Sequence, residues 1–196
     1  MATLLKWFFK FLFRFYGWKL DRNMPDYGKQ AVLIAAPHTS NWDFPYVIAC
    51  FDLLKIPVRF TIKKEWMKFP FAATMKRFGA VSIDRSPKIP GEERKSMVEA
   101  MTDLFKIHDE FILTVTPEGT RARREQWKTG FYHIAKNAGV PILLSYLDYK
   151  HKVAGVGKMI WPSDDMEADM REIMAFYLEH SHGKNPENFS VDIRYI

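Results

Sequence analysis

The stretch AVLIAAPHTSNWDFPYVIACFDLLK, residues 31–55, changes character twice. Its first six residues form an uninterrupted apolar run, which predicts a buried strand. A polar loop follows at residues 37–42. Residues 43–55 then predict a helix, in which Pro45 is tolerated because it falls in the first turn. A buried strand, a polar loop and a helix in this order are typical of an α/β fold.

Strand-like and helix-like segments continue to alternate along the chain. Strands are predicted at residues 58–64, 80–85, 110–116, 140–149 and 152–161, and an edge strand at 189–196. Helices are predicted at residues 67–79, 91–107, 131–139 and 164–182. We therefore expect an α/β fold with a mixed, mostly parallel central sheet flanked by helices. In such folds, ligands bind beyond the carboxyl ends of the strands.

The composition is that of a globular domain with a basic excess. The chain has 196 residues, of which 47% are hydrophobic, and we expect residues 23–196 to form one domain. The net charge of +6 favours an anionic partner, such as a membrane surface, a phosphorylated ligand or nucleic acid. Cys50 is the only cysteine, which excludes an internal disulfide and favours a reducing compartment.

Residues 1–22 predict a helix that lies on a membrane surface. Three basic residues recur every fourth position, and most other positions are aromatic or leucine. No uncharged run approaches the roughly 20 residues that span a bilayer. We expect a peripheral (monotopic) protein on the cytoplasmic face of an anionic membrane, with contacts from Lys6, Trp7, Phe8, Lys10, Phe11, Arg14, Phe15 and Trp18. The alternative is a core helix whose lysines reach out to solvent.

The polar loop after the first buried strand places His38 five residues before Asp43. If the loop turns tightly into the helix, Asp43 can accept the ring N–H of His38 and leave the other nitrogen free as a general base. No serine, cysteine or second acid nearby completes an obvious nucleophilic triad. The same letters also fit an ordinary polar loop that caps a helix.

Two further strand-end segments carry groups that suit an anion. In PEGTRARR, residues 117–124, Gly119 allows close backbone approach, Thr120 offers a hydroxyl and Arg121 can hold a phosphate with two hydrogen bonds. Glu118 can orient that arginine or a substrate hydroxyl. Arg85 closes the earlier segment GAVSIDR. For each segment, a solvated surface turn is the alternative.

Together these segments resemble the PlsC-like glycerolipid acyltransferases, the family of 1-acyl-sn-glycerol-3-phosphate acyltransferase. HTSNWD matches the H-x4-D motif of the family, and GAVSIDR is similar to its second block. PEGTRAR is similar to its E-G-T-R block, and VPILL to its fourth block. The resemblance runs in order from about residue 31 to residue 144. Two departures are Pro37, where the family often has asparagine, and Leu144–Ser145, where a second proline is common.

The resemblance implies a reaction and a set of roles. His38 would be the general base and Asp43 its orienting partner. The acceptor's polar head would bind at Arg85, Glu118, Gly119, Thr120 and Arg121. The acyl donor would be acyl-CoA or acyl-acyl-carrier protein, used without an acyl-enzyme, a bound cofactor or a metal. The acceptor would be a lysophospholipid, with lysophosphatidic acid the commonest in the family and a lyso-aminolipid the alternative.

Two other classes of function compete with this interpretation. A nucleic-acid-binding module would explain the basic charge, but no nucleic-acid motif is present. A catalytically silent lipid-binding protein would not need to keep both His38 and Asp43. A metal site is not expected, because the remaining histidines lack metal-ligand spacing with carboxylates or cysteine or lie on a predicted helix. These histidines are His108, His133, His151, His180 and His182.

Overall fold

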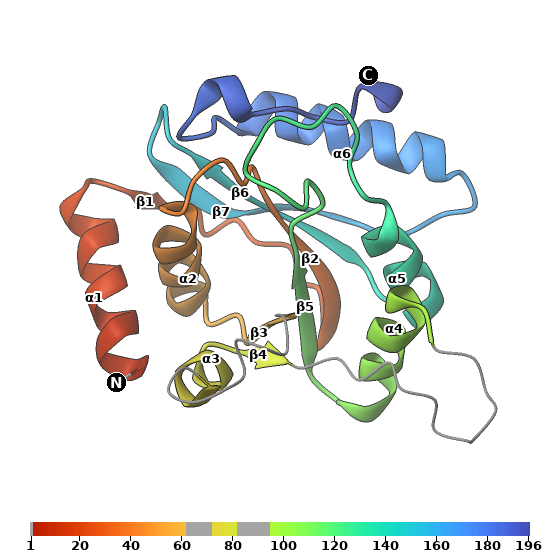
Figure 1. Ribbon diagram of the computed structural model, residues 1–196, viewed down its shortest axis with the longest axis horizontal. Helices are drawn as coiled ribbons and strands as arrows, with labels where there is room; N and C mark the ends of the chain where they lie inside the picture. The colour runs from red at the N-terminus through yellow and green to blue at the C-terminus, as the bar shows by residue number, and fades with distance from the viewer. Residues whose placement is uncertain (1, 62–71, 82–94) are drawn as a thin grey trace.

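A seven-stranded sheet forms the centre of the computed structural model, which describes residues 2–61, 72–81 and 95–196 (Figure 1). The strands are β1 (Lys19–Leu20), β2 (Gln30–Ala36), β3 (Val58–Thr61), β4 (Ala80–Val81), β5 (Phe111–Val115), β6 (Ile142–Asp148) and β7 (Val153–Ile160). Their order in the sheet is β1-β7-β6-β2-β5-β3-β4. All neighbours pair in parallel except β6 and β7, which form an antiparallel pair. The prediction of a mixed, mostly parallel sheet is therefore confirmed.

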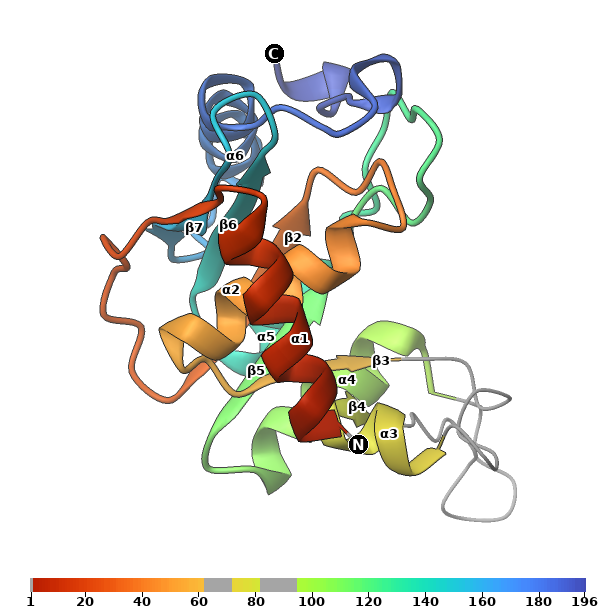
Figure 2. The ribbon, with the colours of Figure 1, turned by 90° about the vertical axis from the view of Figure 1, so that its left-hand side faces the viewer.

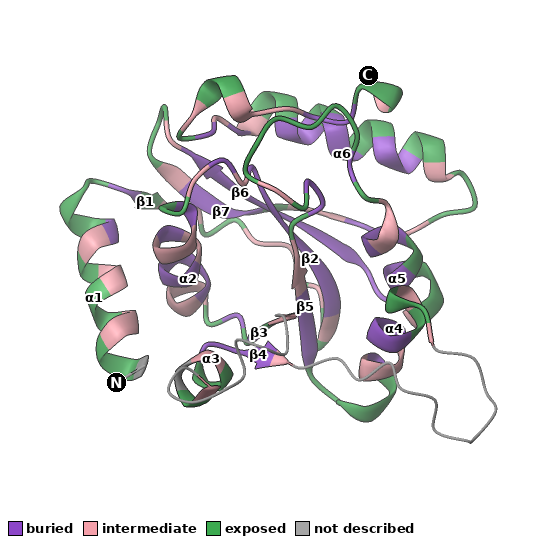
Figure 3. Cartoon of the chain, viewed as in Figure 1, coloured by how far each residue is buried: buried purple, intermediate pink, exposed green. Residues whose placement is uncertain are grey.

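Helices cover both faces of the sheet. They are α1 (Ala2–Phe15), α2 (Asp43–Leu54), α3 (Ala72–Arg77), α4 (Met97–Ile107), α5 (Gly130–Ala138) and α6 (Met166–His180). One core lies between the sheet and α4, α5 and α6, and the other lies between the sheet and α1 and α2. The central strand β2 serves both cores, because Val32 and Ile34 point to one and Ala31 and Leu33 to the other. This burial on both faces explains its uninterrupted apolar sequence (Figure 3).

The N-terminal segment is built into the domain as well as lying at its surface. Helix α1 runs across α2 (Figure 2), and β1 extends the sheet beside β7. Trp18 is only 7% exposed and packs against Phe13, Tyr46 and Tyr149. The prediction that Trp18 contacts a membrane is therefore wrong in this arrangement, because its ring belongs to the core. Within the described residues, no helix is both long enough and apolar enough to cross a bilayer.

Helix α4 begins at Met97, where Ser96 forms a capping box with Glu99. The Ser96 hydroxyl accepts the Glu99 N–H, and the Glu99 carboxylate accepts the Ser96 N–H. The sequence predicts this helix over residues 91–107, of which residues 91–94 lie outside the described part of the chain. Ser96 is a stronger start signal than glutamates alone, because its side chain satisfies an amide that has no partner within the helix.

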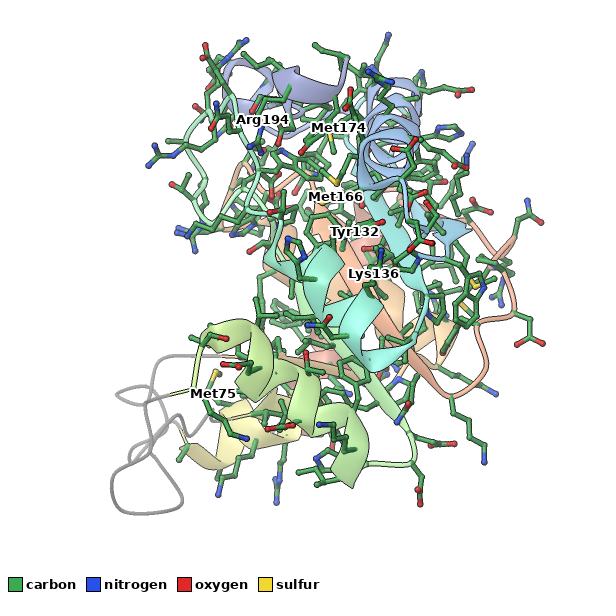
Figure 4. The ribbon with its side chains drawn as sticks, turned by 90° about the vertical axis from the view of Figure 1, so that its right-hand side faces the viewer. Met75, Tyr132, Lys136, Met166, Met174 and Arg194 are labelled. Atoms are coloured by element: carbon green, nitrogen blue, oxygen red, sulfur yellow. The ribbon has the colours of Figure 1, made fainter. Side chains whose placement is uncertain are left out.

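The C-terminal segment does not form the predicted edge strand at residues 189–196. Instead it contains one short 3-10 helix, η3 (Ile193–Tyr195), and a second, η2 (Pro186–Asn188), directly precedes the segment. The fully buried Asp192 accepts the Trp127 N–H at 2.9 Å and an Arg194 guanidinium N–H at 2.6 Å. Arg194 also donates to the Trp127 carbonyl, at the same end of the molecule as Met174 (Figure 4). The backbone of this segment also bonds to the loop between β5 and α5, because the Ile193 N–H donates to the Glu125 carbonyl and the Ser190 carbonyl accepts the Trp127 indole N–H. These two groups are therefore not available to a sheet edge.

Replacing Asp192 by alanine should destabilise the protein by roughly 2–4 kcal/mol. The substitution leaves the Trp127 N–H without its acceptor and Arg194 without its carboxylate. Urea unfolding measures the loss. Asp164→Ala is the matched control, because Asp164 is fully exposed and, within the described residues, pairs only with Lys136, so its loss should change stability far less than that of Asp192. Equal losses in the two variants would contradict the role given to Asp192.

Candidate active site

The carboxyl ends of β2 and β5 lie side by side and lead to opposite faces of the sheet. The two strands pair in parallel at the centre of the sheet. The chain leaves β2 for α2 in one core, whereas it leaves β5 for α5 in the other. A crevice opens at such a point, since the two connecting loops diverge. These loops are residues 37–42, hereafter the His38 loop, and residues 116–129, hereafter the EGTR loop.

His38 and Asp43 meet in this crevice as the sequence predicts. The Nδ1 atom of His38 lies 3.2 Å from Oδ2 of Asp43. Asp43 is buried, whereas the His38 ring keeps some exposure. With its proton on Nδ1 facing the carboxylate, the ring has Nε2 free to accept a proton. Among the described residues, Nε2 has no hydrogen-bond partner.

The Asp43 carboxylate is held by the His38 loop and by Tyr149, the residue that follows β6. Its Oδ2 atom accepts the backbone N–H groups of Thr39 and Ser40, both at 2.8 Å. Its Oδ1 atom accepts the Tyr149 hydroxyl at 2.7 Å. Burial and the neighbouring carboxylate raise the pKa of Tyr149 well above its ordinary value, so the hydroxyl keeps its proton and donates. Sequence reasoning missed Tyr149, because no spacing rule connects it to a residue 106 positions earlier.

Glu118 joins the two loops. Its Oε1 atom accepts the His38 backbone N–H at 2.9 Å. The side chain is 8% exposed, and Oε2 has no hydrogen-bond partner within the described residues. Burial is the main cause that raises the pKa of Glu118 to about 7. Glu118 thus positions the His38 loop, and within the described residues no ion pair joins it to Arg121.

A cavity of about 740 Å³ opens beside His38 between α2, β3 and β5. Most of its wall is apolar, with Phe44, Val47, Phe51 and Phe60 among the lining side chains. His38 and Asp43 lie at the polar end of this cavity, with Gly119, Arg121 and Lys128. The volume falls within the range of small-molecule sites, and the lining suits a ligand with an apolar tail and an anionic head.

The EGTR loop supplies the cationic groups at this end of the cavity. Gly119 has a φ of +65°, which favours glycine, and a Cβ atom there would come within 2.9 Å of the Lys128 amine. Lys128 also lines a second cavity of about 690 Å³, together with Thr120 and Glu118. The structure thus brings Gly119 and Arg121 to the cavity beside His38 and adds Lys128, which no sequence motif indicates, whereas Thr120 lines the second cavity. Arg85 lies outside the described residues.

Comparison with known proteins gives the family. A model of the acyltransferase family matches residues 19–144, about two thirds of the chain. The chain belongs to the PlsC-like acyltransferase family. Membership of this family means that the protein is an enzyme that transfers an acyl group to a lipid. A search of curated proteins finds no match.

Replacing Glu118 by glutamine should change how stability depends on pH. Because folding raises the pKa of Glu118 from 4.5 to about 7, the folded state binds more protons between these values. The free energy of unfolding therefore falls as the pH rises through this window. The amide introduced by Glu118→Gln would still accept the His38 N–H but cannot ionise. The stability of the wild-type acyltransferase relative to Glu118→Gln should fall by roughly 3 kcal/mol from about pH 4 to about pH 8.

Urea unfolding across this pH range provides the measurement. Glu125→Gln is the control, because Glu125 lies exposed in the same loop and should show no such relative change. If stability changed with pH in the same way in the wild type and in Glu118→Gln, the raised pKa of the Glu118 carboxyl would be contradicted.

Proposed function

We propose that the enzyme transfers a fatty acyl group from a thioester donor to the hydroxyl of a lysophospholipid, with lysophosphatidic acid as the acceptor and phosphatidic acid as the product. One observation carries this proposal: the His38–Asp43 pair lies where an apolar cavity meets a cationic loop. A lysophospholipid and an acyl thioester both combine an apolar chain with an anionic head. The site matches this division of polarity.

In the proposed reaction, His38 is the general base. Its Nε2 atom accepts the acceptor's hydroxyl proton as the oxygen attacks the thioester carbonyl carbon. The tetrahedral intermediate then collapses, and the C–S bond breaks. The thiolate of CoA or of acyl carrier protein leaves and takes the proton back from His38. Asp43 keeps the ring in the required tautomer and stabilises the imidazolium that forms between these steps.

The surroundings of His38 favour direct transfer over an acyl-enzyme. Cys50 is buried in α2, and burial raises the pKa of its thiol far above the usual range, so it does not supply a thiolate. The Ser40 hydroxyl accepts the Trp42 N–H, and the Thr39 hydroxyl accepts the Asn185 N–H. Neither hydroxyl bonds to His38 within the described residues, as an activated nucleophile would.

The cationic side chains of the EGTR loop position the anionic head group of the acceptor. Arg121 and Lys128 can bind a phosphate while the acyl chain occupies the apolar cavity. The same two groups favour a second candidate acceptor, a lyso-aminolipid, because its carboxylate is also an anion. We assign Arg85 to this head-group site from its motif alone.

The acceptor can be tested with the purified full chain. A labelled acyl donor, supplied as acyl-CoA or as acyl-acyl-carrier protein, is offered with lysophosphatidic acid, neutral lysophospholipids and a lyso-aminolipid, and the products are read by mass spectrometry. We expect acylated lysophosphatidic acid to dominate. Dominant product from the lyso-aminolipid would support the second candidate, and no product from any acceptor would overturn both.

Replacing His38 by alanine should lower kcat by about 10²–10⁴-fold, the usual contribution of a general base. The fold should survive, because the His38 ring is partly exposed at the crevice. Steady-state assays with the best acceptor measure the loss, and circular dichroism checks the fold. His133→Ala is the control, because His133 lies exposed on α5 away from the crevice. Full activity in His38→Ala would contradict the proposed base.

We further propose that α1 holds the enzyme on the cytoplasmic face of a membrane. An aromatic face on this helix is exposed, with Trp7 at 68% and Phe15 at 70%. Phe11 stacks against both rings, and Phe8 lies on the same exposed face. Such a face favours burial among lipid headgroups. Lys6 and Lys10 instead pair with Asp52 of α2, which leaves Arg14 and Lys19 exposed near the end of the helix.

Replacing both Trp7 and Phe11 by serine should weaken binding to anionic vesicles at least about tenfold, because two large apolar side chains no longer insert. Vesicle co-sedimentation with the full chain measures binding. Trp161→Ser is the matched control, since Trp161 is 58% exposed but follows β7 rather than lying on α1. Unchanged binding by the double variant would contradict the proposed membrane face.

A further inference from the structure

Three side chains outside the crevice converge on one point. Asp148 ends β6, His151 lies in the turn before β7, and His182 follows α6. The Nδ1 atom of His151 lies 2.6 Å from Asp148 Oδ2, and the Nδ1 atom of His182 lies 3.0 Å from Asp148 Oδ1. One ligand atom from each side chain lies within 4.8 Å of the others. Three protein ligands around one ion require this spacing.

The carboxylate at the centre of this cluster is fixed before any ligand binds. Asp148 is buried, and its Oδ1 atom accepts the backbone N–H groups of Lys150 and His151 at 3.0 and 3.1 Å. The two imidazoles reach it from the solvent side, where the His151 side chain is 59% exposed. An ion can therefore enter from solvent without any rearrangement of the core.

We propose that Asp148, His151 and His182 bind one divalent transition-metal ion, with Zn²⁺ as the favoured ion. Two imidazole nitrogens and one carboxylate oxygen form a donor set that zinc accepts readily. Calcium and magnesium are disfavoured because they prefer sites made of oxygen alone. A water molecule would complete four-coordination. The expectation of no metal site rested on spacing along the sequence, whereas His182 reaches the cluster from 34 residues away.

The position of the cluster indicates a structural role for the ion. Two segments meet there; one contacts Asp43 directly after the His38 loop, and the other contacts the His38 loop itself. On the first segment, the Tyr149 hydroxyl donates to Asp43, and the Tyr149 N–H donates to the His182 carbonyl. On the other segment, the Asn185 side chain donates to the Thr39 carbonyl at 3.0 Å. A bound ion would join these two segments behind the His38 loop and restrict the movement of that loop.

Metal binding to the untagged full chain tests this proposal without any substrate. The protein is first freed of metal with a chelator and then titrated with Zn²⁺ in competition with a chromophoric chelator. We expect saturation at one zinc per chain and a higher melting temperature with zinc. His151→Ala and His182→Ala should each weaken the affinity by more than about 100-fold, because loss of a ligand exceeds the 10–100-fold effect of losing a group that only supports one.

Control variants and a second measurement make the outcome decisive. His133→Ala removes an exposed histidine elsewhere and should bind zinc as the wild type does. His151→Ala removes a largely exposed ring, and circular dichroism confirms that it folds. Zinc should also slow hydrogen exchange at the Thr39 and Ser40 amides in the wild type but not in His151→Ala. No saturable binding, or binding by both cluster variants equal to that of the wild type, would overturn the site, and unchanged exchange with zinc bound would overturn its structural role.

Discussion

The buried Asp43 carboxylate is the group on which the crevice depends. A carboxylate removed from water must be compensated, and here four groups face it: the His38 ring, two backbone amides of the His38 loop and the Tyr149 hydroxyl. The amides fold the loop into a tight turn, and the hydroxyl connects it to the end of β6. Because these partners occupy most of the lone pairs, the carboxylate has one orientation toward His38. The geometry of the pair is therefore set by the fold before any substrate arrives.

The main features of the fold were predictable because they follow from local patterns. The apolar run of β2, the polar loop after it and the helix-compatible stretch that follows, with Pro45 in its first turn, predicted the strand, the loop and the helix that carry His38 and Asp43. The alternating pattern of residues 189–196 predicted an edge strand, and this prediction was wrong. Asp192 is buried by a hydrogen-bond network and not by a sheet. Tyr149 and Lys128 were not predictable either. The strand order and the packing of the loops place these two residues at the site, and no local sequence pattern indicates either of these arrangements.

The N-terminal helix shows how the same residues can follow a predicted pattern and serve another purpose. The four-residue spacing of Lys6 and Lys10 places them on one side of α1, as expected. That side faces Asp52 of α2, so the two charges fasten the helix to the domain. Ion pairing lowers the pKa of Asp52 despite its partial burial, which agrees with a carboxylate that stays charged between two amines. The exposed face is left to aromatic rings.

Phe9 lies on the inner side of this helix and touches both Phe44 and Phe78. Phe44 is itself a wall of the cavity beside His38. A tilt of α1 at a lipid surface would therefore press on, or release, the chamber in which we place the acyl chain. The same helix would then respond to the composition of the bilayer and affect the length of acyl chain that the cavity accepts. A truncated enzyme could not separate these two properties, since removing the helix would also remove the contact of Phe9 with Phe44.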